Sequence, residues 1–166
     1  MTVGRLASAR GALMLGLCSA GLVILLDQLA KAWVLGALDD PPRVIELSGF
    51  LDLVLVWNRG VSFGLFGSGT LGSWPFVALA VVVSLGLAIW LVRLRRALMV
   101  LTVGLILGGA LGNVIDRLIY GAVIDFIDLH SGSWHWPAFN IADAAITVGV
   151  VILAADALPK FRKRHR

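Results

Sequence analysis

The sequence predicts a protein of the membrane all-α class, a bundle of four transmembrane helices with a small β-sheet and a short surface helix outside the membrane. Hydrophobic residues make up 59% of the 166 positions and charged residues only 14%, against about 25% in soluble domains. Four apolar stretches each reach the roughly 20 residues that a helix needs to cross a bilayer. The longest segment between two of them contains β-branched residues in partial alternation, which is typical of strands.

The four predicted spans cover residues 13–35, 74–92, 97–115 and 140–158 of a single domain, residues 1–166. The first span contains Asp27, Lys31 and the single cysteine, Cys18, which we interpret as a small buried residue. The second and third spans contain no charged residue, and the fourth has an acidic residue near each end. Charged residues inside a span usually pair with one another or mark a functional site.

An outer insert, residues 39–73, separates the first two spans. Pro41 and Pro42 end the first span because proline cannot continue a helix. Residues 44–47 and 51–57 are predicted strands, with a glycine-rich loop after them. Two strands alone are marginally stable, so we expect this sheet to rest on lipid or on the helix bundle.

Glycines recur at every fourth position of the third span, at Gly104, Gly108 and Gly112. Such a smooth helix face lets another helix backbone approach closely. Gly108 and Gly112 also lie near Asn113 and Asp116 in the sequence. This face therefore either supports helix packing or leaves room for a substrate.

A second outer loop, residues 120–137, leads into the fourth span. We expect an amphipathic surface helix over residues 120–130 and a turn after it. Asn140 lies at the N-cap position of the fourth span, and Asp143 follows with the spacing of a capping box. Taken alone, Asp143 is explained by this cap and by the positive end of the helix dipole.

The basic residues predict the orientation in the membrane. Ten of the fourteen Lys and Arg residues lie before the first span, between spans two and three, or in the tail at residues 160–166. The positive-inside rule then places both termini in the cytoplasm and the two outer loops on the other side. Attraction to anionic lipid explains the basic tail, so no nucleic-acid partner is expected.

Asp125 and Asp143 suggest an acid pair at the outer face of the membrane. Asp125 lies in an apolar context, between Ile124 and Phe126. Two nearby carboxyl groups in a low dielectric cannot both ionise readily, which yields one acid and one base at neutral pH. Such a pair suits the attack of a water molecule on an amide bond without a covalent intermediate.

Other polar residues are candidates for binding. Asp27 and Lys31 are four residues apart, so they either form a self-neutralising pair or present Asp27 to an outer cavity. Arg117 offers a planar donor fork for a carbonyl, an ester or a phosphate. His130 and His135 are too few to form a zinc site, which needs three or four ligands, so no metal is expected.

Five motifs follow one another along the chain. They are Asp27-Gln28-x-x-Lys31, Asn58-x-Gly60-x-x-Phe63-Gly64, Gly108-Gly109-x-x-Gly112-Asn113-x-x-Asp116-Arg117, Val123-Ile124-Asp125-Phe126 and Phe139-Asn140-x-Ala142-Asp143. In this order they resemble the lipoprotein signal peptidases of bacteria, also called signal peptidase II. The resemblance runs over about residues 13–158, and Ser62 replaces the more usual alanine of the second motif.

The resemblance implies an aspartic endopeptidase of the bacterial inner membrane, with Asp125 and Asp143 as the catalytic pair and no cofactor. Its substrate would be a prolipoprotein that carries a diacylglyceryl group on cysteine, cut just before that cysteine, and globomycin-type peptides would inhibit it. The implied substrate-binding residues are Asp27, Lys31, Asn58, Gly60, Asn113, Arg117 and Asn140, and the implied structural supports are Asp116, Gly108 and Gly112. We expect a monomer, because one chain supplies every element.

Two other function classes stay open from the residues alone. A proton-coupled transporter also uses intramembrane acids, but it should carry them near the middle of the membrane and often shows internal repeats. A structural or assembly protein would use the same acids only to cap helices and to form ion pairs.

Overall fold

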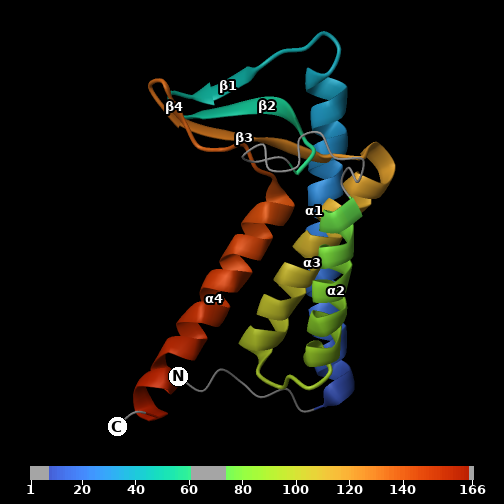
Figure 1. Cartoon of the computed structure of the whole chain (residues 1–166), viewed down its shortest axis with the longest axis vertical. Helices are drawn as coiled ribbons and strands as arrows, with labels where there is room; N and C mark the ends of the chain where they lie inside the picture. The colour runs from blue at the N-terminus through green and yellow to red at the C-terminus, as the bar shows by residue number, and fades with distance from the viewer. Residues whose placement is uncertain (1–7, 61–73, 165–166) are drawn as a thin grey trace.

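The computed structural model describes residues 8–60 and 74–164, and the side chains only as far as residue 158. The part of the outer insert at residues 61–73, including Phe63 and Gly64, and the side chains of the basic tail lie outside the described residues. The described chain forms four long helices, α1 (Ala9–Leu38), α2 (Trp74–Leu91), α3 (Ala97–Tyr120) and α4 (Ile141–Arg164). It also forms four strands, β1 (Ile45–Ser48), β2 (Leu51–Asn58), β3 (Val123–Ser131) and β4 (Trp134–His135) (Figure 1).

The four predicted spans are confirmed as helices long and apolar enough to cross a membrane. Helix α3 lies among the other three and is the most buried of them. Apolar side chains such as Leu22 of α1, Leu79 of α2 and Val148 of α4 are exposed. Apolar surface turned outward on every side of a bundle is what lipid solvation requires, so the chain is a multi-pass membrane protein.

The glycine face of α3 is filled by neighbouring helices. A Cβ atom added at Gly104 would lie 2.6 Å from the Gly16 carbonyl oxygen of α1, and one at Gly108 would lie 2.5 Å from that of Ala20. A Cβ atom added at Gly109 would likewise overlap the Ala142 carbonyl oxygen of α4. The packing interpretation therefore holds at these three glycines, and the alternative, that they leave room for a substrate, does not.

The sheet is larger than expected, with the antiparallel order β1-β2-β3-β4. The prediction of a surface helix over residues 120–130 is wrong, because β3 occupies that segment. Gly121 ends α3 with a left-handed φ of 71° and donates its N–H to the Arg117 carbonyl. The β-branched residues that follow then pair with β2, placing Val123 opposite Asn58 and Asp125 opposite Val56.

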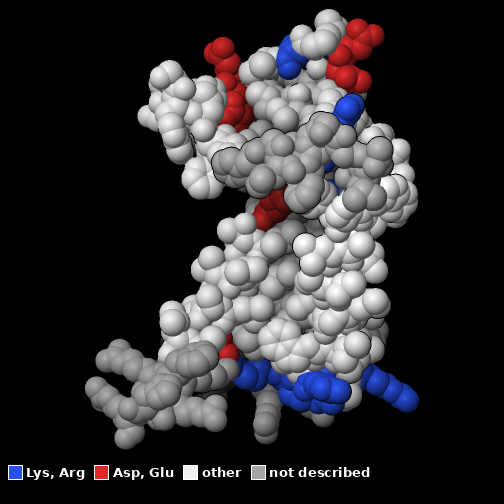
Figure 2. Space-filling view, in the orientation of Figure 1, with Lys and Arg blue, Asp and Glu red and all other residues white. Residues whose placement is uncertain are grey.

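The sheet rests on the bundle, one of the two supports expected. Val34 and Leu38 of α1 form a buried cluster with Ile124 and Phe126 of β3. The sheet lies at one end of the molecule, opposite the beginning of α1 and the end of α4 (Figure 1). Figure 2 shows a band of Lys and Arg atoms at the end away from the sheet, and acidic atoms gathered around the sheet. The first residues of β3 and of α4 thus meet at the sheet end of the bundle.

Candidate active site

Asp125 lies near the start of β3 and is only 1% exposed. Its two oxygens accept hydrogen bonds from two amides, Asn58 Nδ2 at 2.9 Å and Asn140 Nδ2 at 2.7 Å. The pKa of Asp125 is raised from 3.8 to about 6, chiefly by burial and also by the charge of Asp143, while the two amide hydrogen bonds and the charge of Lys31 oppose the rise. This carboxyl group therefore titrates near neutral pH.

Asp143 lies in the first turn of α4, in the capping box expected from the sequence. Its backbone N–H donates to Asn140 Oδ1 at 2.9 Å, and Asn140 N–H donates to Asp143 Oδ2 at 3.4 Å. Its other oxygen accepts a hydrogen bond of 2.8 Å from Asn113 Nδ2 of α3. Asn140 contacts both aspartates, so the structure brings the two acids together around one amide side chain.

The orientations of these three amides are fixed by their own oxygen atoms. Asn58 Oδ1 accepts the Gly60 N–H at 2.8 Å, and Asn140 Oδ1 accepts the Asp143 N–H. Asn113 Oδ1 accepts from Asn140 Nδ2 at 3.3 Å and from a buried ammonium group. Each NH₂ group must then point at a carboxylate. The acids therefore receive hydrogen-bond donors whose direction the fold determines.

Gly60 has a positive φ of 82°, a backbone conformation that favours glycine. A Cβ atom there would overlap the Phe76 ring of α2. The same ring lies under Arg117, whose guanidinium carbon is 5.6 Å from the ring centroid. Arg117 Nη1 donates to the Asn113 carbonyl at 3.3 Å, and its charge lies within electrostatic range of Asp143. Arg117 is thus held beside the acid pair by a ring that the sequence analysis did not single out.

Asp27 and Lys31 do not face an open cavity. They are 0% and 2% exposed and form an ion pair of 2.6 Å, and Lys31 also pairs with Asp116 at 2.7 Å. Gln28, another residue that the sequence analysis did not select as a site residue, donates to Asp116 Oδ1 at 2.8 Å. Gly112 leaves the space for this group, since a Cβ atom there would lie 2.9 Å from Asp27 Oδ2.

A cavity of about 410 Å³ opens beside Asp125. Its walls are Val56, Trp57, Asn58, Arg59, Asp125, Pro137 and Ala138. Figure 2 shows a notch between the sheet and the helices, with acidic atoms at its inner end. The cavity therefore reaches Asp125 between β2 and the residues that lead into α4.

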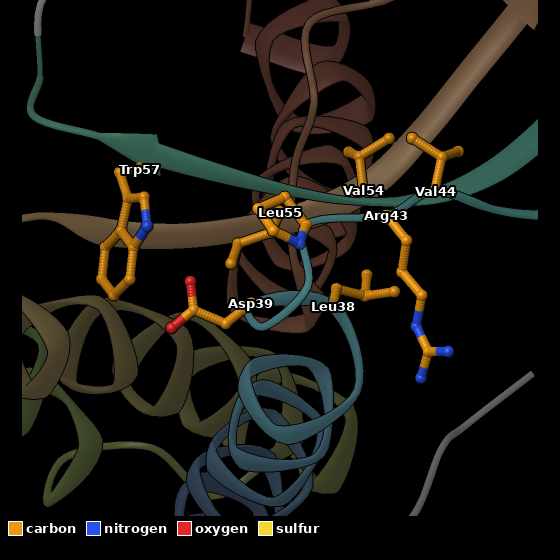
Figure 3. A pocket seen from close by; sticks show the side chains of 8 residues that line it. Leu38, Asp39, Arg43, Val44, Val54, Leu55 and Trp57 are labelled. Carbon is orange, nitrogen blue, oxygen red and sulfur yellow. The ribbon is translucent and has the colours of Figure 1, made fainter.

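A second cavity, of about 440 Å³, lies where β1 leaves β2. Because β1 covers only the first residues of β2, the later ones have an open side facing the end of α1. Figure 3 shows Asp39 and Trp57 directed toward each other across this space, while the Arg43 guanidinium points away. None of the predicted site residues lines this cavity.

His130 lies on β3, and His135 lies on β4 at the edge of the sheet. His130 Nε2 is 3.3 Å from Asp52 Oδ2, and His135 Nδ1 is 2.8 Å from Asp128 Oδ2. Across residues 8–60 and 74–158, no group of three or more His, Cys, Asp or Glu side chains could hold a metal ion. The histidines therefore serve the sheet surface and lie apart from the acid pair.

The chain is similar to known proteins over most of its length. The family model of signal peptidase (SPase) II matches residues 19–159. The chain belongs to the signal peptidase II family. A lipoprotein signal peptidase of Methylobacterium sp. (strain 4-46) is 48% identical over 146 residues, which cover 87% of this chain and 88% of the relative. One of Burkholderia thailandensis is 48% identical over 162 residues, covering 93% and 94% of the two chains.

Solved structures of bacterial membrane enzymes share the fold. One superposes with a TM-score of 0.76 at 25% identity, covering 95% of this chain and 98% of the other. Another gives a TM-score of 0.73 at 27% identity, covering 88% of each chain. Family membership makes this signal peptidase II homologue a peptidase, and the resemblance found in the motifs is confirmed.

Proposed function

We propose that this chain is an aspartic endopeptidase that removes signal peptides from prolipoproteins by cutting before a diacylglyceryl-modified cysteine. The observation that carries the proposal is the pair Asp125 and Asp143, which both contact Asn140, with Asp125 in the wall of a cavity. The family supports prolipoproteins as the substrate class. The aspartic mechanism rests on the chemistry of this pair.

In this mechanism Asp125 holds a proton and Asp143 is ionised when the substrate binds. The raised pKa of Asp125, about 6, favours this distribution of the proton. Asp143 takes a proton from a water molecule, the water oxygen bonds to the scissile carbonyl carbon, and Asp125 protonates the carbonyl oxygen. When the C–N bond breaks, the proton on Asp143 passes to the leaving amine and the proton on the former carbonyl oxygen returns to Asp125. No covalent intermediate forms.

The surrounding residues would position the substrate. Asn58 lines the cavity and is held by the Gly60 N–H, and Arg117 supplies a positive charge near the developing negative charge on the carbonyl oxygen. Diacylglyceryl chains would stay in hydrocarbon while the peptide enters sideways, contributing about 0.8 kcal/mol per buried CH₂. Specificity should therefore depend on the lipid anchor. Globomycin-type peptides would compete for the same space.

The proposed location is the bacterial inner membrane, with the acid pair at its outer face and both termini in the cytoplasm. The band of basic atoms at the end away from the sheet supports this orientation (Figure 2). One chain supplies both acids and all three amides, so a monomer suffices. A cysteine placed at the beginning of α1 should react with a membrane-impermeant reagent only from the cytoplasmic side.

The test is cleavage of a synthetic diacylglyceryl-modified precursor and of its unmodified twin by purified enzyme. Asp125→Asn and Asp143→Asn are each expected to lower kcat by on the order of 10²–10⁴-fold, because each removes a proton-transfer group. Asp128→Asn is the matched control, since it removes a carboxyl of the outer sheet that lies outside the pair. Turnover by either site variant at the wild-type rate would refute the mechanism, and equal cleavage of the two substrates would refute the role of the lipid.

A further inference from the structure

Three buried charged side chains take no part in the proposed reaction. Asp27 and Lys31 of α1 and Asp116 of α3 are each at most 2% exposed. Lys31 Nζ lies 2.6 Å from Asp27 Oδ2 and 2.7 Å from Asp116 Oδ2. Apolar residues of similar volume would often be as stable or more stable in such a place. Stability alone therefore does not account for this group.

Both carboxylates also hold the backbone of another element. Asp116 Oδ2 accepts the Ile124 N–H of β3 at 3.2 Å. Asp27 Oδ1 accepts the Ala142 N–H of α4 at 2.9 Å. Each of these two backbone positions directly precedes one of the candidate catalytic aspartates. The Lys31 ammonium group therefore links the two carboxylates that hold the residues directly before Asp125 and Asp143.

We propose that Asp27, Lys31 and Asp116 form a clamp that sets the separation of the two catalytic aspartates, an assignment that rests on the proposed peptidase function. Lys31 holds the two carboxylates together, and each carboxylate fixes a backbone position next to one acid. Lys31 also donates to Asn113 Oδ1 at 3.2 Å, which orients the amide that bonds to Asp143. The clamp residues touch no reacting atom, so they are positioning residues.

The proposed reaction makes this separation important. Both acids must reach one water molecule and one carbonyl group, and a displacement of about 1 Å can cost 10²-fold in rate. The loss should appear in kcat, because the walls of the cavity are built from other residues. Separation of the acids also weakens their repulsion and admits water. Both changes lower the pKa of Asp125, whereas loss of the Lys31 charge raises it, so the pH midpoint does not report the separation.

Two variants distinguish the positioning of the acid pair from the effect of the net charge of the clamp. Lys31→Met removes the ammonium group, and Lys31→Met combined with Asp116→Asn removes it while keeping the net charge of the group. The first readout is hydrogen exchange at the backbone amides of residues 124 and 142, which requires no activity. Exchange at both amides should quicken together by roughly threefold to tenfold, although they lie on different elements. The control is Arg96→Met, which removes the ion pair with Asp156 at the other end of the bundle.

The second readout uses a diacylglyceryl-modified peptide and the folded double variant. Its kcat should fall by about 10²-fold with KM changed by less than about threefold. A purely structural group would reduce the amount of folded enzyme without changing the kcat of the folded fraction.

Unchanged exchange at both amides, or wild-type kcat in the folded double variant, would overturn the clamp. A wild-type enzyme that fails to cut the lipidated peptide would instead contradict the proposed peptidase function. The exchange measurement would still decide whether the clamp exists.

Discussion

The hydrogen bond from Asn58 to Asp125 gives a quantitative test of the acid pair. Burial and the charge of Asp143 raise the pKa of Asp125 to about 6, and the Asn58 hydrogen bond is the largest influence that lowers it. Asn58→Ala removes this donor. A hydrogen bond to a charged group contributes about 1.5–3 kcal/mol, which corresponds to about one to two pKa units. Water entering the cavity replaces part of this contribution, so we expect a rise of about one unit.

The assay is kcat/KM as a function of pH with a diacylglyceryl-modified peptide, because this parameter reports the ionisation of the free enzyme. If Asp125 must be protonated, the wild-type enzyme should lose activity as the pH rises through about 6. Asn58→Ala should shift that midpoint to about pH 7. Asn58→Ser keeps a hydroxyl donor and should shift it less, which makes it the matched control.

Two results would refute this reasoning. An unchanged midpoint with a lower maximum would mean that the Asn58 hydrogen bond does not act on the group that titrates. Activity that increases as the pH rises through about 6 would make Asp125 the base, and would reverse the roles assigned to the two acids.

Three further outcomes are expected. Gly108→Ala should destabilise the protein by about 1–3 kcal/mol in reversible unfolding, because its Cβ meets the Ala20 backbone, whereas Gly86→Ala should be neutral since nothing lies within 4 Å. Arg117→Lys should lower kcat by about tenfold at unchanged stability, because Lys keeps the charge but loses the planar fork and the stacking on Phe76. Chelators should leave the cleavage rate unchanged, and inhibition by chelation would point to metal chemistry that the described residues do not suggest.

Local sequence patterns predicted those parts of the fold that depend on neighbouring residues. Apolar runs identified the four helices, and alternation identified β1 and β2. The segment that forms β3 was misjudged, because its partner β2 lies about 70 residues earlier and that pairing leaves no local signal. Two local signs did favour a strand. Gly121 stands directly after the last helical residue, and the positions after it are rich in β-branched residues.

In the site, too, contacts between residues close in the sequence were predictable, whereas contacts between distant residues were not. The capping box of Asn140 and Asp143 and the i, i+4 pair of Asp27 and Lys31 are local, and both occur as expected. The third member of the ion-pair group, Asp116, comes from another helix and is joined only by folding. Whether the pair faces a cavity or the interior therefore could not be decided from spacing.

The fixed amides around Asp125 lead to a prediction about stability as well as activity. Asn58 and Asn140 both direct NH₂ groups at this position, so the amide introduced by Asp125→Asn would face two other NH₂ donors, which should lower the stability by about 1–3 kcal/mol at low pH. The pH-dependent part has the opposite sign. The folded-state pKa of Asp125 lies above its ordinary value of 3.8, so wild-type stability is fullest below about pH 3.8 and is lost as the pH rises through about 6.

By this linkage the wild-type protein should lose about 1.5 kcal/mol between about pH 5 and pH 8 through this one carboxyl. The variant lacks the group, so the stability difference between the two proteins should narrow by that amount over the same range. Reversible unfolding at both pH values measures it, with Asp128→Asn as a control whose carboxyl lies on the outer sheet. A difference that stays constant with pH would mean that Asp125 does not titrate above its ordinary range, and the assignment of the proton to Asp125 would then lose its physical basis.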